Sequence, residues 1–341
     1  MVDFAVELRK LLQFAGPRLL GISSHFSVTW SAPERIRGVP DLFANLVWVK
    51  DENGKKFSGF AVDSAPARLV VKAMMESLES LALEDAGLKV QSRTGVAAHF
   101  DEASARDSAY MELIERDAFL FHWLTERPGV PLGLGLESLT QSLHSVRLIS
   151  LDANVEVVLT ASKSSTFGCW HLGVGASRSL STAYQKSYRE WAGSIHCHEV
   201  AQGCQGSAKL ISDDFLWHHQ QSKDHCVSAL LEYIVAGSGG KSLATSAQIF
   251  FQPDGNLDVF SATHFTSLPV RSQRYRVEFA ENSRCLPLFF GDRYKESQKK
   301  YLKILRDRDP IIFDQSEDRR FFHPRALGQD EPLCFLPHPF D

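Results

Sequence analysis

Hydrophobic positions along the chain follow helical spacing in some segments and strand-like spacing in others, which predicts a structure of helices and sheets. The predicted strands are 42–49, 57–62, 90–100, 146–150, 155–161, 169–174, 247–252, 257–263 and 275–279. The predicted helices are 3–15, 65–84, 103–125, 181–196, 226–236 and 292–308. We therefore expect an α+β fold, in which helices cover antiparallel or mixed sheets.

Two of these helices have an apolar stripe with a pair of glutamates beside it. The predicted stripes are Val71, Met75, Leu78 and Ala82 in the first helix, and Met111, Ile114, Ala118 and Phe121 in the second. A glutamate pair would then lie at the edge of buried surface, where a bare carboxylate is costly to desolvate. Such a pair needs a partner there.

The glutamates have the same spacing in both helices, Glu76 with Glu79 and Glu112 with Glu115. Residues three apart share one helical face with Cβ atoms about 5–6 Å apart, so two negative charges repel each other. The spacing therefore predicts that a cation binds between them. The alternative is a pair of solvated, salt-bridged glutamates.

A wider repeat contains these glutamates. Gly59 precedes Glu76 by 17 positions, and Gly95 precedes Glu112 by the same number. Gly173 and Glu190 form a weaker third copy with this spacing, for which chance similarity stays an alternative. The residue three before each of these glutamates is small, namely Ala73, Ala109 and Ser187. The pattern predicts a repeated strand–loop–helix unit.

Several carboxylates from two helices suit Mg²⁺ ions that are bridged by a triphosphate. Arg116 directly follows Glu115 and could donate to a phosphate. A di-iron site would need a histidine three residues after a glutamate, and neither Glu76 nor Glu112 has one there.

Composition narrows the class of protein. The 341 residues are 44% hydrophobic and 23% charged, which allows a packed globular protein. The net charge of −4 gives no field that favours nucleic acid. No apolar run of about 20 residues and no secretory signal is present, so we expect no membrane span. Six cysteines without framework spacing indicate reduced thiols and a cytoplasmic protein.

No low-complexity linker divides the chain, which predicts a single domain over 1–341. We divide it into an N-terminal segment over residues 1–58, the repeated units 59–200, the remainder of the core 201–320 and a proline-rich tail 321–341.

These motifs resemble those of the YcaO-domain family. Copy two, from Gly95 to Asp117, is similar to the central signature of that family, and copy one resembles its first ATP-site segment. Copy three is similar to a later helix in the same fold. The ending Leu336-Pro337-His338-Pro339-Phe340-Asp341 resembles the carboxy terminus of the azoline-forming members. The resemblance implies a YcaO-like fold.

The resemblance also implies a reaction. Family members use ATP and Mg²⁺ to activate a peptide amide oxygen, and in azoline formation a Cys, Ser or Thr side chain attacks the preceding carbonyl. The ligands of Mg²⁺ and ATP phosphates would be Glu76, Glu79, Glu112 and Glu115, with Arg116 and Glu190 in the nucleotide site. The tail residues Pro337, Pro339 and Asp341 would organise or deprotonate the substrate.

The chain departs from the family pattern at three places. Ser80 stands where an arginine is common, the loop Gly59-Phe60-Ala61 lacks the usual glycine and lysine, and Asp341 stands in place of a third alternating proline. A scaffold or substrate-binding subunit without catalysis is therefore the alternative function. Thioamide and amidine chemistry also stay open.

The expected partners follow from the same resemblance. They are a precursor peptide, a separate subunit that resembles E1 enzymes and binds the leader peptide, and a flavin oxidase if azoles are the product. The product would be a ribosomally made peptide antibiotic or bacteriocin. No nucleic acid or membrane is expected as a partner.

Two other motifs contain residue types that are common in binding sites. Gly237-Ser238-Gly239-Gly240-Lys241-Ser242 lacks the first glycine of a P-loop, because position 235 is Val235. His196, Cys197, His198 and Cys204 contain zinc-ligand residue types, but adjacent side chains on a helix diverge.

Overall fold

The structure is a computed structural model. It describes residue 6 and the ranges 27–31, 33–87, 94–133, 143–164, 168–203, 225–236, 258–270 and 275–286, together with 301, 303–305, 307 and 308. Its contacts form two compact units, of which the first contains 1–112, 192–199 and 263–281, and the second 113–191, 200–262 and 282–341. The single domain expected over 1–341 stays a prediction.

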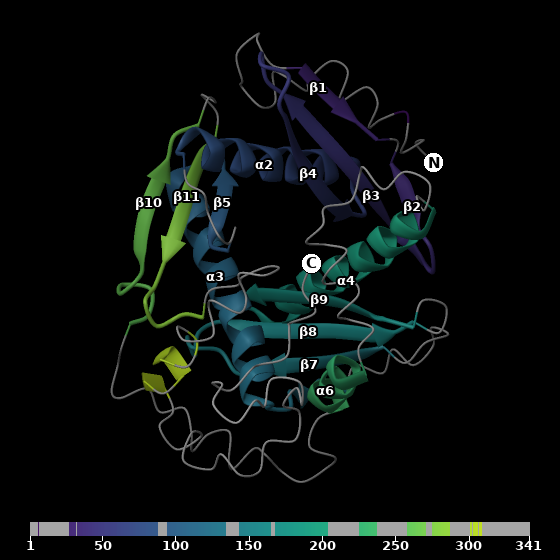
Figure 1. Cartoon of the computed structure of the whole chain (residues 1–341), viewed down its shortest axis with the longest axis vertical. Coiled ribbons are helices and arrows are strands. Elements are labelled where there is room, and N and C mark those ends of the chain that lie inside the picture. The colour runs from purple at the N-terminus through teal and green to yellow at the C-terminus, as the bar shows by residue number, and fades with distance from the viewer. Residues whose placement is uncertain are drawn as a thin grey trace, which may run out of the picture. The chain divides into compact units, whose positions relative to one another are not determined.

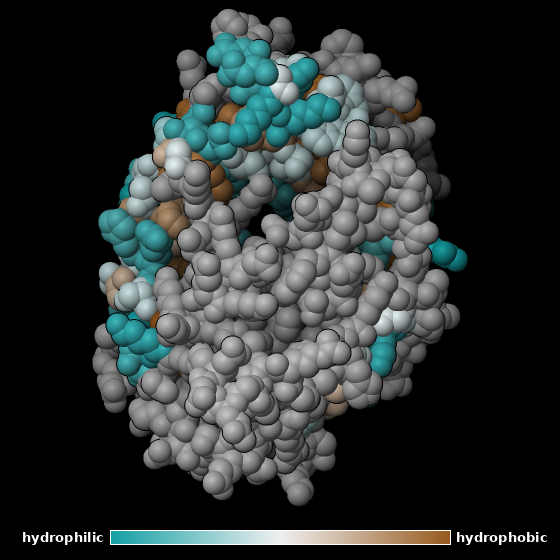
Figure 2. All heavy atoms as spheres, in the orientation of Figure 1, coloured by the Kyte–Doolittle hydropathy of each residue, from teal (hydrophilic) through white to brown (hydrophobic). Residues whose placement is uncertain are grey.

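The first unit contains a four-stranded antiparallel sheet. Strand β3 (Val39–Lys50) pairs with β1 (Ser27–Trp30), β2 (Glu34–Ile36) and β4 (Lys56–Asp63). The turn from β3 to β4 is closed by the Asp51 carboxylate, which accepts the Lys55 main-chain N–H at 2.7 Å, and by Gly54 at φ 83°. Hydrophilic residues gather over this end of the sheet (Figure 2).

Helix α2 (Pro66–Asp85) covers this sheet and begins with proline at its first turn, where the missing N–H costs nothing (Figure 1). The predicted range 65–84 is therefore confirmed. The predicted stripe was only half right, because Leu78 and Ala82 are buried whereas Val71 and Met75 are half-buried. The observed face is rotated by about one residue and contains Leu69, Val70, Ala73, Met74, Ser77, Leu78, Leu81, Ala82 and Leu83.

A second sheet of the first unit also contacts α2. Strand β11 (Arg276–Glu281) lies between β10 (His264–Leu268) and β5 (Val96–His99), and both pairings are antiparallel. The core shared by α2 and the two sheets includes Val47, Leu69, Met74, Leu78 and Val277.

The second unit is built on the antiparallel sheet β6-β7-β8-β9. Its strands are β6 (Val130–Pro131), β7 (His144–Leu148), β8 (Glu156–Lys163) and β9 (Trp170–Ser177). Helix α6 (His225–Ala236) contacts β6 and β7 (Figure 1). Every sheet among the described strands is antiparallel, which agrees with the predicted α+β class.

Two long helices contribute residues to both units, α3 (Glu102–Thr125) and α4 (Leu180–Gly203). The predicted stripe of α3 is confirmed, since Met111, Ile114, Ala118 and Phe121 are all buried. Other faces of α3 are buried too, because Tyr110, Phe119, Leu120 and Trp123 have almost no exposed surface. A helix buried on most faces has a weak amphipathic pattern, which explains why the sequence predicted only one of its buried faces.

Some predicted elements differ from the structure. The strand 257–263 was wrong, because 259–262 form a turn and the strand β10 follows at His264–Leu268. Short strands β1, β2 and β6 were missed, and α4 extends beyond the predicted 181–196. Most of the helix 3–15, the strand 247–252 and the tail 321–341 lie outside the described residues. No described helix has the length and apolar character needed to cross a membrane.

Candidate functional site

The repeated unit of the sequence has a physical basis in close strand–helix packing. A Cβ atom placed on Gly59 of β4 would lie 1.9 Å from the Ala73 carbonyl oxygen on α2. A Cβ atom on Gly173 of β9 would lie 2.1 Å from the Ser187 carbonyl oxygen on α4. Glycine is therefore required where each strand touches its helix, and the small residue of the repeat marks the contact point.

The weaker third copy is thus supported by the same contact as the first. In copy two, Gly95 has φ 79°, and a Cβ atom there would lie 3.7 Å from the Ala109 carbonyl oxygen. Each glycine approaches the carbonyl of the residue 14 positions later, although the approach is looser in copy two. Two close contacts at one spacing, with an ordinary van der Waals contact at the third, favour a true repeat over chance.

The glutamates of copy one accept hydrogen bonds from two different strands. Phe60 on β4 donates its main-chain N–H to Glu76 Oε2 at 3.0 Å. Ala98 on β5 donates its N–H to Glu79 Oε1 at 2.8 Å. Glu76 is exposed and Glu79 half-buried, so these bonds fix the orientation of carboxylates at the edge of the core.

Copy two provides the most buried carboxylate of the predicted set. Glu115 is only 6% exposed, and its Oε2 accepts the main-chain N–H of Ala176 on β9 at 2.9 Å. The Arg116 guanidinium is partly buried, with Nε 4.0 Å from Glu115 Oε1. Glu112 is half-buried one turn earlier on α3. A buried carboxylate beside a cation and an N–H donor is well stabilised in its charged form.

The remaining predicted residues are placed as follows. Glu190 lies on α4 and is exposed. Glu76, Glu79 and Glu112 belong to the first unit, whereas Glu115, Arg116 and Glu190 belong to the second. The tail residues Pro337, Pro339 and Asp341 lie outside the described residues, so their roles stay predictions.

Ser80 shows what the first departure from the family pattern means structurally. Its hydroxyl donates to the Glu76 carbonyl oxygen of its own helix at 3.1 Å. A serine engaged with its own helix adds no cation, so copy one lacks a counterpart of Arg116 at this position.

Sequence reasoning assigned no role to Asp117, although it follows Arg116. This aspartate is fully buried, accepts two bonds from the Arg308 guanidinium at 2.6 and 3.1 Å, and accepts the Leu286 N–H at 2.7 Å. Arg308 also lies over the Phe121 ring at 4.8 Å. The pair ties a segment near the end of the chain to α3, and no local pattern could reveal a partner so distant in sequence.

The described carboxylates suit Mg²⁺ as ligands. Magnesium prefers oxygen ligands, and glutamate oxygens provide them. Ligand carboxylates are usually held by further hydrogen bonds from the protein, as Glu76, Glu79 and Glu115 are by main-chain N–H groups. The residues present therefore fit the predicted metal.

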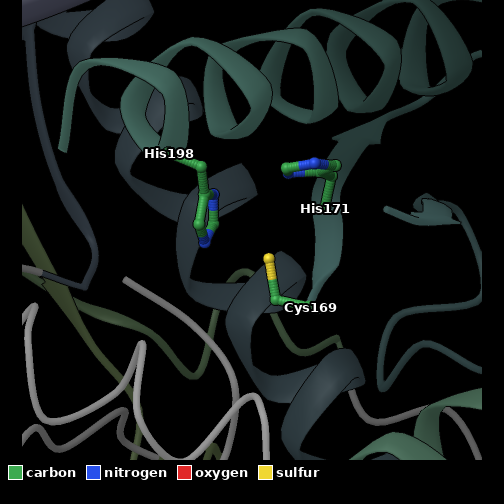
Figure 3. Close-up of side chains that lie close together, drawn as sticks. All are labelled: Cys169, His171 and His198. Carbon is green, nitrogen blue, oxygen red and sulfur yellow. The ribbon is translucent and has the colours of Figure 1, made fainter. Parts of the chain in front are cut away.

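Of the four residues in the zinc motif considered from the sequence, Cys204 lies outside the described residues. His196 stacks on Phe60 with ring centroids 6.0 Å apart. Cys169 lies just before strand β9 and His171 within it, and His198 lies on helix α4 (Figure 3). All three side chains are buried.

Sequence comparison identifies one family. The model of the family described as YcaO cyclodehydratase, ATP- and Mg²⁺-binding, matches residues 65–246, which include the predicted glutamates and Arg116. No curated protein matches the chain.

The chain is also similar to solved structures. A structure of YcaO from Methanopyrus kandleri bound with AMPPCP and Mg²⁺ is 14% identical, covers 58% of this chain and 68% of that one, and has a TM-score of 0.44. The E. coli microcin synthetase McbBCD complex with pro-MccB17 bound is 13% identical, with coverages of 75% and 87% and a TM-score of 0.49.

A heterocyclase in complex with substrate and cofactor gives a TM-score of 0.52 at 11% identity. The match covers 84% of this chain, which spans about half of the heterocyclase (53%). At this identity the likeness to the heterocyclase concerns the fold alone, and it agrees with the α+β architecture.

The family match covers more than half of the 341 residues and includes the glutamates of all three copies of the repeat. Its description confirms the cofactors predicted from the sequence, ATP and Mg²⁺. The chain belongs to the YcaO family.

Proposed function

We propose that this chain catalyses the ATP- and Mg²⁺-dependent cyclodehydration of Cys, Ser or Thr residues in a ribosomally made precursor peptide. The observation that carries the proposal is the placement of Glu76, Glu79 and Glu115, each held by a main-chain N–H from a strand of the repeat. Carboxylates that are fixed in this way support metal binding against phosphates. Membership of the YcaO family supports the same reaction.

The proposed reaction removes one water from the peptide. The side-chain sulfur or oxygen loses its proton and forms a bond to the preceding carbonyl carbon. The C–O bond of that carbonyl then breaks, and the amide nitrogen loses its proton as the C=N bond of the ring forms. ATP supplies the phosphoryl group with which that oxygen leaves as phosphate, so the products are azoline, ADP and phosphate. The glutamates would hold Mg²⁺, and Arg116 would donate to a phosphate.

The proposed partners are the precursor peptide, a separate E1-like subunit that binds its leader and, for azole products, a flavin oxidase. We place the reaction in the cytoplasm and assign the product to the peptide antibiotics or bacteriocins. The heterocyclase of similar fold is a complex with substrate and cofactor, which agrees with a chain that binds both.

The test is reconstitution of the chain with its partner subunit and precursor peptide. Cyclodehydration predicts release of phosphate and loss of one water mass from the peptide for each ring formed. Absence of both ATP–Mg²⁺ binding and phosphate release in the complete mixture would refute the enzyme proposal.

Ser80 favours a second candidate, a YcaO-like scaffold or substrate-binding subunit without catalysis. Copy one lacks the arginine that would contact phosphate, and the Ser80 hydroxyl is bonded to its own helix. This candidate predicts that the chain binds the precursor peptide but leaves ATP unchanged. Phosphate release in the reconstituted mixture distinguishes the two.

A further inference from the structure

The second glutamate of one copy is bonded to the strand of the following copy. Glu79 accepts the N–H of Ala98, which lies three residues after Gly95. Glu115 accepts the N–H of Ala176, which lies three residues after Gly173. The two bonds are equivalent in the repeat, and their lengths, 2.8 and 2.9 Å, are typical of charge-assisted hydrogen bonds.

The third copy makes the corresponding contact with the first, without a carboxylate. Gly193 lies three residues after Glu190, where the second glutamate would stand. A Cβ atom on Gly193 would lie 3.2 Å from Val62 Cγ2 and 3.1 Å from Phe60 Cε1. Val62 lies three residues after Gly59, so it occupies the same position in its copy as Ala98 and Ala176.

The contacts therefore run from copy one to two, from two to three and from three to one, each of them within a single unit. Only the first two have a glutamate. At the third position, a Cβ atom on Gly193 would fit tightly against Phe60 and Val62, whose side chains would have to shift slightly. Glutamates therefore occupy two of the three equivalent positions of the repeat.

The strands present these N–H groups on the side away from their own sheet partners. Ala98 pairs with Val277 and Ala176 with Val157, both in antiparallel ladders. In such a ladder, a residue directs its N–H and C=O to one side, toward or away from its partner. The Ala176 carbonyl accepts a hydrogen bond from the Lys186 ammonium at 3.0 Å. The C=O of Ala176 therefore points toward side chains, as its N–H does.

We propose that the main-chain amides of Ala98 and Ala176 position the Glu79 and Glu115 carboxylates for Mg²⁺, an inference that rests on the proposed function. Each amide holds one carboxylate oxygen and so limits rotation of the carboxylate. The strand of one copy thereby sets the metal-binding geometry of the preceding copy. These residues are positioning residues, because they act through the glutamates.

The test compares proline with glycine at the same position. Proline has no N–H, whereas glycine keeps the donor and differs from alanine only by the methyl group. We would titrate Mg²⁺ into Ala176→Pro and Ala176→Gly in the presence of AMPPCP, with binding followed by calorimetry, and repeat the pair at Ala98. Loss of an outer-shell partner usually weakens metal binding about 10–100-fold, and we expect this ratio between each proline variant and its glycine counterpart.

Equal Mg²⁺ affinity of folded proline and glycine variants would overturn the positioning role, even if the wild-type chain binds AMPPCP and Mg²⁺ normally. Failure of the wild-type chain to bind them would instead refute the proposed function, and the positioning role with it. If a proline variant does not fold, lactic acid at position 176 replaces the N–H by an ester oxygen with little change in shape. The same loss of affinity is then expected.

Discussion

The Ala176 main-chain N–H donates to Glu115 Oε2 at 2.9 Å, which joins strand β9 of the third repeat copy to helix α3 of the second. Glu115 is the most buried of the predicted metal ligands. The contact combines the two features that stand out in the sequence, the glutamate pair and the repeat.

Replacing Glu112 and Glu115 by glutamine should abolish ATP turnover while the fold persists. Glutamine keeps an oxygen that can accept the Ala176 N–H, but it removes the charge that Mg²⁺ requires. Phosphate release with precursor and partner present is the measurement, and circular dichroism checks the fold. Glu84→Gln is the matched control, since Glu84 is exposed and pairs with Lys55 on the surface. Unchanged turnover in the double variant would refute the site assignment.

Gly173→Ala should destabilise the second unit by about 3 kcal/mol, a typical upper value for overpacking. The new methyl group would lie 2.1 Å from both the Ser187 carbonyl oxygen and the Trp191 nitrogen, which are backbone atoms that cannot rotate away. Gly193→Ala is the comparison, because its methyl would meet only side-chain atoms at 3.1 and 3.2 Å. Urea denaturation measures the free energy of unfolding of both variants, and equal losses of stability would contradict the proposed strand–helix contact.

Acidification should destabilise the protein through His122. This imidazole is buried, with Nδ1 2.9 Å from the Arg127 carbonyl oxygen and Nε2 accepting the Ile149 N–H at 2.7 Å. Burial lowers its pKa from 6.5 to about 4. The unfolded chain therefore binds a proton first as pH falls, so the stability present above pH 6.5 decreases until about pH 4.

The difference between these two pKa values corresponds to about 3 kcal/mol, lost over that pH range. Urea denaturation at a series of pH values measures the loss. His122→Asn should remove this component of the pH dependence, whereas His264→Gln, a change at an exposed histidine, should leave it. If the free energy of unfolding depends on pH equally in wild type and His122→Asn, His122 is not the source of this pH dependence.

Arg308→Met should destabilise the protein by about 3–5 kcal/mol, because it leaves the buried Asp117 carboxylate without its cation. The Asp117→Asn/Arg308→Met double variant should recover some of that loss, since it also removes the buried charge. Arg147→Met tests an exposed ion pair with Glu156 and should cost less than about 1 kcal/mol. Thermal denaturation compares all three, and a small effect of Arg308→Met would show that the pair contributes little.

Truncating the chain before Pro337, so that residues 337–341 are removed, should abolish cyclodehydration and preserve ATP binding. The predicted role of Pro337, Pro339 and Asp341 concerns the substrate, and none of them is a predicted ligand of Mg²⁺. Nucleotide binding by calorimetry and ring formation by mass spectrometry separate the two effects. Full activity of the shortened chain would refute the role of the tail.

The sequence by itself determined the long elements and the repeat. Helices α2 and α3 were predicted within a residue of their observed ends, and the predicted strands 42–49 and 57–62 lie within β3 and β4. The glycine and small-residue spacing predicted the strand–helix units, because close backbone contact restricts those positions to small residues. Short strands such as β1 and β2 were missed, since their pattern extends over too few residues.

The tertiary structure decided which partners these elements have. Glu79 and Glu115 each stand three residues after another glutamate, but their N–H donors come from strands of other copies. The partner of Asp117 proved to be Arg308, 191 residues away, which no local pattern indicates. Local patterns indicate which face of an element is buried. Hydrogen bonds and ion pairs between distant segments depend on which segments the tertiary fold brings together.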